Sequence, residues 1–299
     1  MKVNFWGTRG SLATPGRETA RYGGNTSCVE IVGENGSRLV LDAGTGIRTL
    51  GMALPLGLRR VDILLTHLHL DHIQGLGFFR PLFNPAMEVH IWGPASTRLE
   101  LRTRLMRYLS APLFPVPLRD LPCKLVLHEV PCAIVHVGEF EISSSLICHP
   151  GPTVGYRVSG SGGVVAYLSD HEPALGKRRL RLPAEWTSGH ALAEDADLLI
   201  HDAQYTDEEY AERVGWGHSS LTQAIQFATL ARARHLVAFH HDPAHDDSTL
   251  DRLIAEAISQ EQPTFKVTAA AEGAVFELGQ SRRPEPRRCR NLETPMLRG

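Results

Sequence analysis

The sequence lacks cysteine pairs and long apolar segments, and each absence excludes a class of protein. There are five cysteines among 299 residues, and no two of them form a CxxC pair: Cys28, Cys123, Cys132, Cys148 and Cys289. An odd number without such a pair argues against a disulfide framework and favours a reducing compartment. The first residues carry no apolar signal core, and no stretch reaches membrane-spanning length. We therefore expect a cytoplasmic protein without membrane contact.

An excess of positive charge is also absent. Lysine and arginine total 31 against 33 aspartates and glutamates, for a formal net charge of -2. Such a balance gives no overall attraction to nucleic acid or to an anionic membrane, although it still allows a local basic patch. Nucleic acid is therefore not favoured as a partner. Only residues 281–299 are rich in arginine and proline with few apolar side chains, so we expect a domain over 1–280 and a basic C-terminal tail.

The pattern of apolar residues predicts an α/β fold. Short β-branched runs separated by turns occur before residue 66 and again between 124 and 169, and both read as strands. Helical spacing follows at 44–54, 94–109, 219–233 and 248–260. Strand runs followed by helix–strand alternation, twice along the chain, predict two sheets packed face to face with helices outside.

The segment "LLTHLHLDHIQGL", residues 64–76, places four candidate metal ligands directly after a strand-like run. Alternate residues of an extended backbone share a face, so His67 and His69 can bind one ion. Asp71 and His72 lie where a helix is expected to begin, and can reach a second ion. Neutral imidazole with carboxylate, without thiolate, suits zinc, manganese or iron. The intervening Leu68 and Leu70 are expected to point into the core.

Two coordination shells need more ligands, and three later apolar runs end on suitable side chains. His149 follows "SSSLIC", Asp170 follows "VVAYLS", and His240 follows "HLVAF", with His241 as a competitor. Strand ends that gather along one rim of a sheet are where sites form in layered α/β folds. We therefore expect these side chains to lie beside the segment 67–72.

These motifs together resemble the metallo-β-lactamase superfamily over nearly all of residues 1–280. "HLHLDH", a lone histidine, an aspartate after a strand and a histidine after a strand carry the resemblance. "FWGTRGS", "GGNTSCVEI", "LVLDAGTGI" and "GHSSLTQAIQFA" are similar to the branch that contains tRNase Z and the phosphodiesterases of cyclic nucleotides and cyclic ribose phosphates. The resemblance implies a four-layer αββα sandwich with a dinuclear site.

Residue by residue, the resemblance implies two groups of ligands for two divalent ions, Zn²⁺ or Mn²⁺. The first ion would be held by His67, His69 and His149, the second by Asp71, His72 and His240, and Asp170 would bridge both. His240 is preferred to His241 because it directly follows the strand run. His241 is then expected to support a ligand or to lie at the surface.

The chemistry implied is hydrolysis of a phosphodiester. Two ions can share a hydroxide that attacks phosphorus, while the leaving oxygen still needs a proton. The resemblance assigns that donor to His218, whose alternative role is a neighbour of a helix N-terminus. Asp71 is expected to accept or orient a proton of the attacking water. Asp42 and Asp202 are expected to orient ligating imidazoles, although Asp202 could equally cap a turn.

The substrate expected is small: a cyclic nucleotide, a cyclic ribose phosphate or a short dinucleotide. About twenty residues separate His149 from Asp170, enough for a hairpin but not for the tRNA-gripping arm of long-armed tRNase Z proteins. Three alternatives stay open: a lactonase-type hydrolase, a tRNA 3′-processing endonuclease without a long arm, and a non-catalytic metal-binding sensor. The branch also implies a homodimer.

Two further segments have open roles near such a site. The segment 80–122 is expected to shape the mouth of the pocket. Its arginines would form either a lid over phosphate or a solvated helix face: Arg98, Arg102, Arg104 and Arg107. The glycine turns "GTRGS" and "YGGNTS", with Asn25 and Ser27, could offer hydrogen bonds to an anion.

Overall fold

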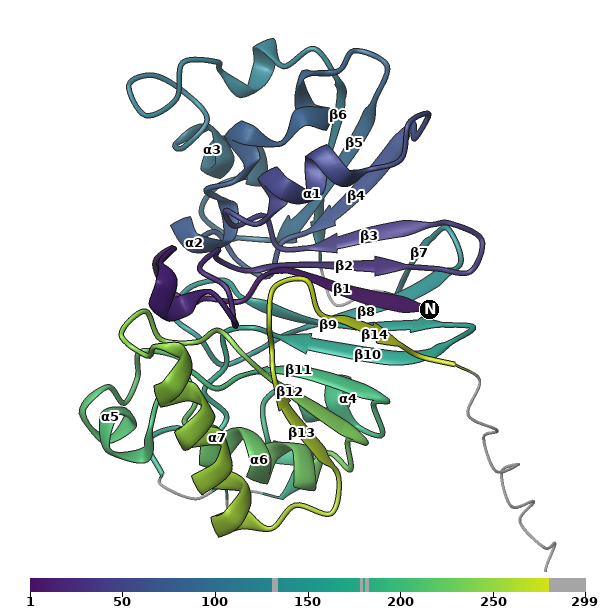
Figure 1. Ribbon diagram of the computed structural model, residues 1–299. Helices are drawn as coiled ribbons and strands as arrows, with labels where there is room; N and C mark the ends of the chain where they lie inside the picture. The colour runs from purple at the N-terminus through teal and green to yellow at the C-terminus, as the bar shows by residue number, and fades with distance from the viewer. Residues whose placement is uncertain (131–133, 178–179, 181–182, 280–299) are drawn as a thin grey trace, which may run out of the picture.

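Two mixed sheets lie face to face between layers of helices (Figure 1). The computed structural model describes residues 1–130, 134–177, 180 and 183–279. The predicted tail 281–299, together with Cys132 and Cys289, lies outside these residues. The four-layer α/β sandwich predicted from the sequence is confirmed, whereas the boundary of the domain at residue 280 stays a prediction.

The first sheet has seven strands in the described part of the chain, in the order β14-β1-β2-β3-β4-β5-β6. Strands β1 to β3 pair antiparallel, and β3 to β6 run parallel. The strands are β1 (Lys2–Gly7), β2 (Cys28–Val32), β3 (Arg38–Leu41), β4 (Arg60–Leu64), β5 (Glu88–Pro94), β6 (Lys124–Val130) and β14 (Val275–Glu277).

The second sheet has the order β13-β12-β11-β10-β9-β8-β7, again counted over the described residues. Strands β10 to β13 run parallel, and β7 to β10 form antiparallel hairpins. The strands are β7 (Val135–Val137), β8 (Phe140–Leu146), β9 (Val154–Gly160), β10 (Gly163–Leu168), β11 (Leu198–Asp202), β12 (His235–Phe239) and β13 (Lys266–Ala269). Only the short β9–β10 hairpin separates His149 from Asp170, as the residue spacing predicted.

Helices cover the outer face of each sheet. α1 (Ile47–Ala53), α2 (Leu70–Ile73) and α3 (Leu101–Met106) lie on the first sheet, and α4 (His190–Ala193), α5 (Asp207–Glu212), α6 (Leu221–Leu230) and α7 (Asp247–Glu261) on the second (Figure 1). Five short 3-10 helices lie at 17–19, 76–78, 80–83, 118–120 and 184–186 in the described chain. Among the described helices, none has both the length and the hydropathy needed to cross a membrane.

Three apolar layers hold the sandwich together. Between the sheets, side chains such as Phe5, Tyr167 and Phe239 pack from both sides. Outside the first sheet, Ile63 and Ile91 face α1, α3 and their loops. A third layer packs α4, α6 and α7 against the second sheet. Burial of apolar area on both faces of each sheet fixes the strand register, because a shift by one residue would turn polar side chains inward.

The helix predicted over 94–109 is wrong at its start. Pro94 is the last residue of β5, where it pairs with Val130, and α3 begins only at Leu101. Val89 and Ile91 are buried against the helices in the two-residue alternation of a strand. The chain therefore stays extended through Pro94, and the helix begins only after it. Residues 88–94 of the segment 80–122 therefore form a strand of the sheet, and the segment is not merely an addition at its rim.

Candidate metal centre

Strand ends from both sheets converge at one edge of the sandwich. β4 leads to His67 and His69, β8 to His149, β10 to Asp170 and β12 to His240. Four strands of the second sheet run in the same direction: β8, β10, β11 and β12. β8 and β10 agree because both are antiparallel to β9, which lies between them, and β10 to β12 are parallel to each other. Their carboxyl ends therefore meet where ligand sites form in open sheets.

The first ligand group, which we call the open triad, consists of His67, His69 and His149. One nitrogen of each ring lies within 4.8 Å of the others. His69 Nδ1 is 3.2 Å from His149 Nε2, and the ring centres of His67 and His69 are 4.4 Å apart. His69 is exposed, whereas the side chain of His149 is only 1% exposed.

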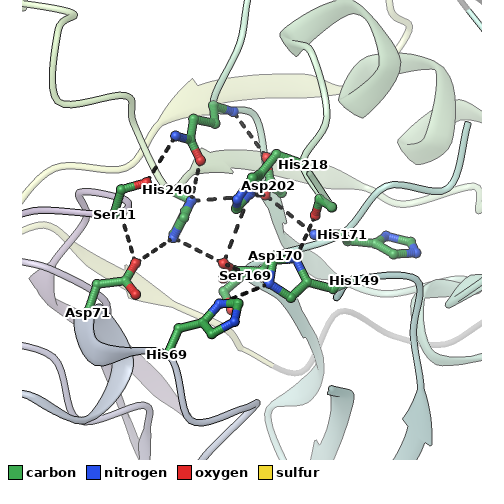
Figure 2. Close-up of polar contacts among 12 residues, drawn as sticks. Ser11, His69, Asp71, His149, Ser169, Asp170, His171, Asp202, His218 and His240 are labelled. Carbon is green, nitrogen blue, oxygen red and sulfur yellow. Dashed lines mark hydrogen bonds and ion pairs between the residues drawn. The ribbon is translucent and has the colours of Figure 1, made fainter. Parts of the chain in front are cut away.

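The second group, the buried tetrad, consists of Asp71, His72, Asp170 and His240, and all four are buried. His240 Nε2 is 3.2 Å from Asp71 Oδ2, 3.3 Å from His72 Nε2 and 3.3 Å from Asp170 Oδ2. Figure 2 shows His240 beside Asp71 and Asp170, close to His218. The structure thus brings all seven predicted ligands together, in the two groups expected.

Asp170 lies between the two groups. Its Oδ1 is 3.0 Å from His72 Nε2 in the tetrad, and its Oδ2 is 3.7 Å from His67 Nε2 and 4.0 Å from His149 Nε2 in the triad. Oδ2 is also 3.3 Å from His240 Nε2, so both oxygens face the tetrad and Oδ2 faces the triad as well, a position that suits a bridging ligand.

The hydrogen bonds behind the tetrad fix which imidazole nitrogens carry protons. Asp42 Oδ2 can only accept, so His72 Nδ1 donates to it over 2.8 Å. Gln204 Nε2 faces the Asp242 carboxylate at 3.3 Å, so its Oε1 faces His240 and accepts from His240 Nδ1 at 3.0 Å. With Nδ1 protonated on both rings, both Nε2 atoms present lone pairs to each other and to two carboxylates.

The same reasoning applies to the triad. His149 Nδ1 donates to the Gly217 carbonyl at 2.9 Å, which leaves a lone pair on Nε2. The Thr66 hydroxyl donates to Asp42 and therefore accepts from His67 Nδ1 at 3.0 Å. His67 Nε2 is buried without a hydrogen-bond partner among the described residues, and the ligand-type atom that Asp170 Oδ1 faces is His72 Nε2 at 3.0 Å. Imidazole nitrogens and two carboxylates that converge in one buried space attract positive charge, so these residues fit a pair of divalent ions.

The protonation of the cluster also suits cations. Burial lowers the pKa of His67, His69 and His149, which keeps them in the neutral, metal-binding form. Burial opposes charge on His72, yet the Asp170, Asp71 and Asp42 carboxylates outweigh it and raise its pKa. The tetrad therefore attracts positive charge, which a metal ion supplies more strongly than a proton on one ring.

The two ligand carboxylates are held ionised by the same surroundings. Burial alone would raise their pKa values. The His72 and His240 rings outweigh burial at Asp71, and His240, His72 and His67 outweigh it at Asp170, so the pKa of each carboxyl lies well below its usual range. Both are ready to bind metal at neutral pH.

His218 forms a dyad with Asp202 at the edge of the cluster. Its Nδ1 is 2.7 Å from Asp202 Oδ2 and 3.9 Å from Asp170 Oδ2. Burial opposes its charge, but Asp202 outweighs burial, with smaller contributions from Asp170 and Asp71, and raises the pKa of His218 to about 9. A protonated imidazole is therefore available there in the protein alone, and bound cations would lower this pKa toward neutrality.

Asp202 caps a turn, one of the two roles that the sequence left open, and the imidazole it holds is His218, whereas the predicted ligand His240 is 4.0 Å away. Besides holding His218, it accepts the backbone N–H of Gln204 and of Ser219 through Oδ1, each at 3.1 Å. One carboxylate therefore fixes the end of β11, the residue that follows His218, and the His218 ring itself.

Three supporting groups were missed by sequence reasoning. Gln204 orients His240, as described above. The Ser11 amide donates to Asp71 Oδ2 at 2.7 Å, so the turn "GTRGS" bonds a ligand carboxylate. Glu172 is buried, and it accepts from the backbone N–H of Gly215 and Gly217 at 2.9–3.1 Å. No local motif marks these roles, because each partner is distant along the chain.

Glycine is required at two positions beside the ligands. A Cβ on Gly10 would lie 2.4 Å from His240 Nδ1, and one on Gly217, which has φ +89°, would lie 2.3 Å from His149 Nδ1. A side chain at either position would displace a ligand ring.

Several expectations around the site need correction. His241 neither touches the ligand cluster nor lies at the surface: it is buried and donates through Nε2 to the Ala270 carbonyl at 2.9 Å. Asn25 Nδ2 is bonded to Glu272 at 2.9 Å and is not free for an anion. Leu70 is 56% exposed, because it begins α2 at the rim of the site instead of continuing the strand.

A cavity of about 370 Å³ opens beside the triad. His67, His69 and Leu70 form one side, and Pro150 and Pro152 continue it. Residues in and after α3 also line it: Arg104, Arg107, Tyr108 and Leu113. The segment 80–122 thus shapes the mouth of the cavity as expected, but only two of its four predicted arginines line it.

Comparisons with known proteins agree with this geometry. A family profile described as a beta-lactamase superfamily domain matches residues 37–241. A ribonuclease Z of Natronomonas pharaonis is 27% identical over 306 aligned positions, which cover 87% of this chain and 94% of that protein.

Among solved structures, the short form of human tRNase Z is 25% identical with a TM-score of 0.64, covering 93% of this chain and 99% of that one. The metallo-beta-lactamase fold protein YhfI of Bacillus subtilis has a TM-score of 0.66 and 22% identity, covering 92% of this chain and 98% of that one, and supports the fold alone. Since the matched profile spans more than half of the residues, the chain belongs to the metallo-β-lactamase superfamily.

Proposed function

We propose that this protein is a dinuclear metal-dependent hydrolase that cleaves a small phosphodiester. In this proposal the open triad and the buried tetrad each hold one divalent ion, and Asp170 contacts both. Zn²⁺ and Mn²⁺ both suit a set of imidazoles and carboxylates. The observation that carries the proposal is the convergence of imidazole lone pairs and two carboxylates, with the protonated nitrogens of His67, His72, His149 and His240 turned away toward other acceptors.

The roles of the chain's own residues follow from their contacts. When bound, the two ions supply charge that activates water and neutralises phosphate oxygens. His218 holds a proton close to Asp170 and donates it to the leaving oxygen, while Asp202 keeps the ring in place. Asp71 accepts or orients a proton of the attacking water. The Ser11 amide donates to Asp71 Oδ2 and thereby fixes the orientation of the carboxylate.

The size and composition of the site support a small substrate. The cavity of about 370 Å³ lies near the lower end of the ~300–1,000 Å³ typical of small-molecule pockets. The β9–β10 hairpin leaves no room for an arm between His149 and Asp170. A cyclic nucleotide, a cyclic ribose phosphate or a short dinucleotide fits these limits.

The relatives favour a second candidate, cleavage of tRNA precursors. The curated relative and the human structure are named ribonuclease Z and tRNase Z, and both align with this chain over most of their length. These relatives weaken the expectation from net charge that nucleic acid is not a substrate. A short enzyme of this kind would have to grip RNA without an arm between His149 and Asp170.

A turnover screen separates the candidates. The purified full chain, with its metal content measured, would be assayed on cyclic mononucleotides, cyclic dinucleotides, cyclic ribose phosphate, a tRNA precursor and a lactone. We expect about two ions per chain and turnover of a small phosphodiester. Turnover of the precursor alone would favour the tRNA role, and turnover of the lactone alone would favour a lactonase. Full metal content without any hydrolysis would favour a sensor.

The domain boundary can be tested in the same assay. We propose that residues 1–280 carry the activity and that 281–299 are an appendage. A chain ending at residue 280 should keep both ions and its turnover, and loss of either would extend the functional unit into the tail.

A further inference from the structure

The part of the cavity lining that comes from α3 and the residues after it, which we call the wall, carries two arginines with different surroundings. Arg104 is anchored: its Nη2 donates to the Pro94 carbonyl and lies 3.4 Å from Glu129, and its side chain is only 12% exposed. Arg107 is exposed, lines the cavity, and its guanidinium has no hydrogen-bond or ion-pair partner in the described part of the chain. Arg104 therefore supports the wall, and Arg107 is left for a ligand.

The rest of this wall is apolar. Leu113 is 69% exposed and faces the cavity together with Tyr108, whose hydroxyl is tied to the Gln74 carbonyl at 2.5 Å. Leu70, 56% exposed, lines the side nearer the ligands. Large apolar side chains exposed inside one cavity, with a single free cation among them, are typical of a site for a mostly apolar ligand that carries a charge.

We propose that this wall binds the part of the substrate beyond the scissile phosphate, and that Arg107 pairs with a second negative group there. The substrate class that fits is a nucleoside phosphodiester with a further phosphate. Its flat base would pack on Leu113 and Leu70, and its second phosphate would meet the planar donors of Arg107. The inference rests on the proposed function, because it takes the scissile phosphate to lie at the two ligand groups.

Charge supports a terminal phosphate over a carboxylate at this position. Guanidinium groups pair with either anion through two N–H donors, but a phosphate monoester carries about −1.5 to −2 charges at pH 7 against one for a carboxylate. Two cations at the ligand groups would also attract an anionic substrate as a whole. The exposed position of Arg107 means that solvent screens part of this attraction, so its contribution to affinity is modest.

The test compares two substrates that differ only in the second phosphate. Thymidine 5′-(4-nitrophenyl phosphate), with and without a 3′-phosphate, would be assayed with the full-length, metal-loaded protein. We expect the wild type to prefer the substrate with the 3′-phosphate through a lower KM. Arg107→Ala should reduce this preference about tenfold, and Arg107→Lys should retain part of it.

Arg102→Ala is the matched control, because Arg102 lies on the same helix, is exposed and does not line the cavity. It should keep the wild-type ratio of kcat/KM for the two substrates. The inference is wrong if the wild type shows no preference, or if Arg107→Ala and Arg102→Ala change the ratio equally.

A binding measurement keeps the inference separate from the proposed activity. Calorimetric titration would compare thymidine 3′,5′-bisphosphate with thymidine 5′-phosphate on the metal-loaded wild type and on Arg107→Ala. Selective weakening of the bisphosphate in the variant supports the wall site even if neither ester is hydrolysed, in which case only the proposed function fails. Equal binding of both ligands to both proteins overturns the wall site while leaving hydrolysis intact.

Discussion

The open triad and the buried tetrad share Asp170, but they differ in charge and in access to solvent. The triad offers three imidazoles, and its His69 is exposed and lines the cavity. The tetrad is buried throughout and includes the Asp71 carboxylate. Asp42 accepts directly from His72 of the tetrad but reaches His67 of the triad only through the Thr66 hydroxyl, and His149 of the triad donates to a neutral backbone carbonyl.

This difference assigns different tasks to the two groups. In the proposed arrangement, an ion in the tetrad would meet two carboxylates at close range and a third behind a ligand ring, in surroundings that screen charge poorly. An ion in the triad would meet the shared carboxylate and three imidazoles, and it would face the cavity proposed for the substrate. We therefore expect the tetrad to bind its ion more tightly and the triad to make the closer contact with substrate.

Removal of the shared carboxylate should have the largest effect. Asp170→Ala takes away the carboxylate that faces both groups, so that two bound cations would repel each other with no negative group between them. We expect fewer than two ions per chain and loss of turnover. Elemental analysis that finds two ions in this variant would contradict a bridging role, and the exposed Asp120→Ala is the control.

Loss of the proton donor should affect turnover and leave both groups intact. His218→Ala should lower kcat by roughly 10²–10⁴ with both ions retained, the range for one general acid. The loss should shrink with 4-nitrophenyl esters, whose leaving group needs no proton. The exposed His136→Ala is the control, and unchanged kcat on a substrate with an alkoxide leaving group would rule out the role.

A matched pair of supporting variants sharpens the comparison between the groups. Asp42→Asn removes the charge behind His72 and should weaken the tetrad's ion about 10- to 100-fold. Glu172→Gln weakens the support of the Gly217 loop, whose carbonyl holds His149, and should weaken the triad's ion by a smaller factor. Graded chelation followed by metal analysis would measure both. If both variants release the same ion at the same chelator concentration, the two groups do not hold their ions independently.

The smallest effect is expected in the metal-free protein as pH rises. The pKa of His218 is raised from its ordinary value of 6.5 to about 9 in the folded state. The folded protein thus keeps a proton that the unfolded chain releases, and this contribution to stability is complete below about pH 6.5 and is lost as pH rises through 9.

Urea denaturation in the presence of a chelator would measure this effect. Between pH 6 and 9.5, the free energy of unfolding should fall more for the wild type than for His218→Gln, which lacks the titrating ring. Parallel pH profiles for the two proteins would show that the dyad with Asp202 does not hold the proton.

The ligands themselves could be predicted because local geometry places them. His67 and His69 share a face through the two-residue period of an extended chain, and Asp170 and His240 each follow a buried strand whose carboxyl end must reach the common rim. The same local reasoning failed over 94–109, where helical spacing began before the helix did, since the partner of Pro94 is on β6 and not nearby in the sequence.

The sequence by itself was enough to predict the superfamily, the layer order and the seven candidate ligands, because motifs within a few residues carry the family resemblance that implies them. Only the tertiary structure decided which nitrogen of each imidazole faces the cluster, because Gln204, Asp42 and the Gly217 carbonyl that set these tautomers come from distant segments. It also decided which arginine is free. Arg104 and Arg107 are alike in sequence, and packing against Pro94 and Glu129 occupies only the first.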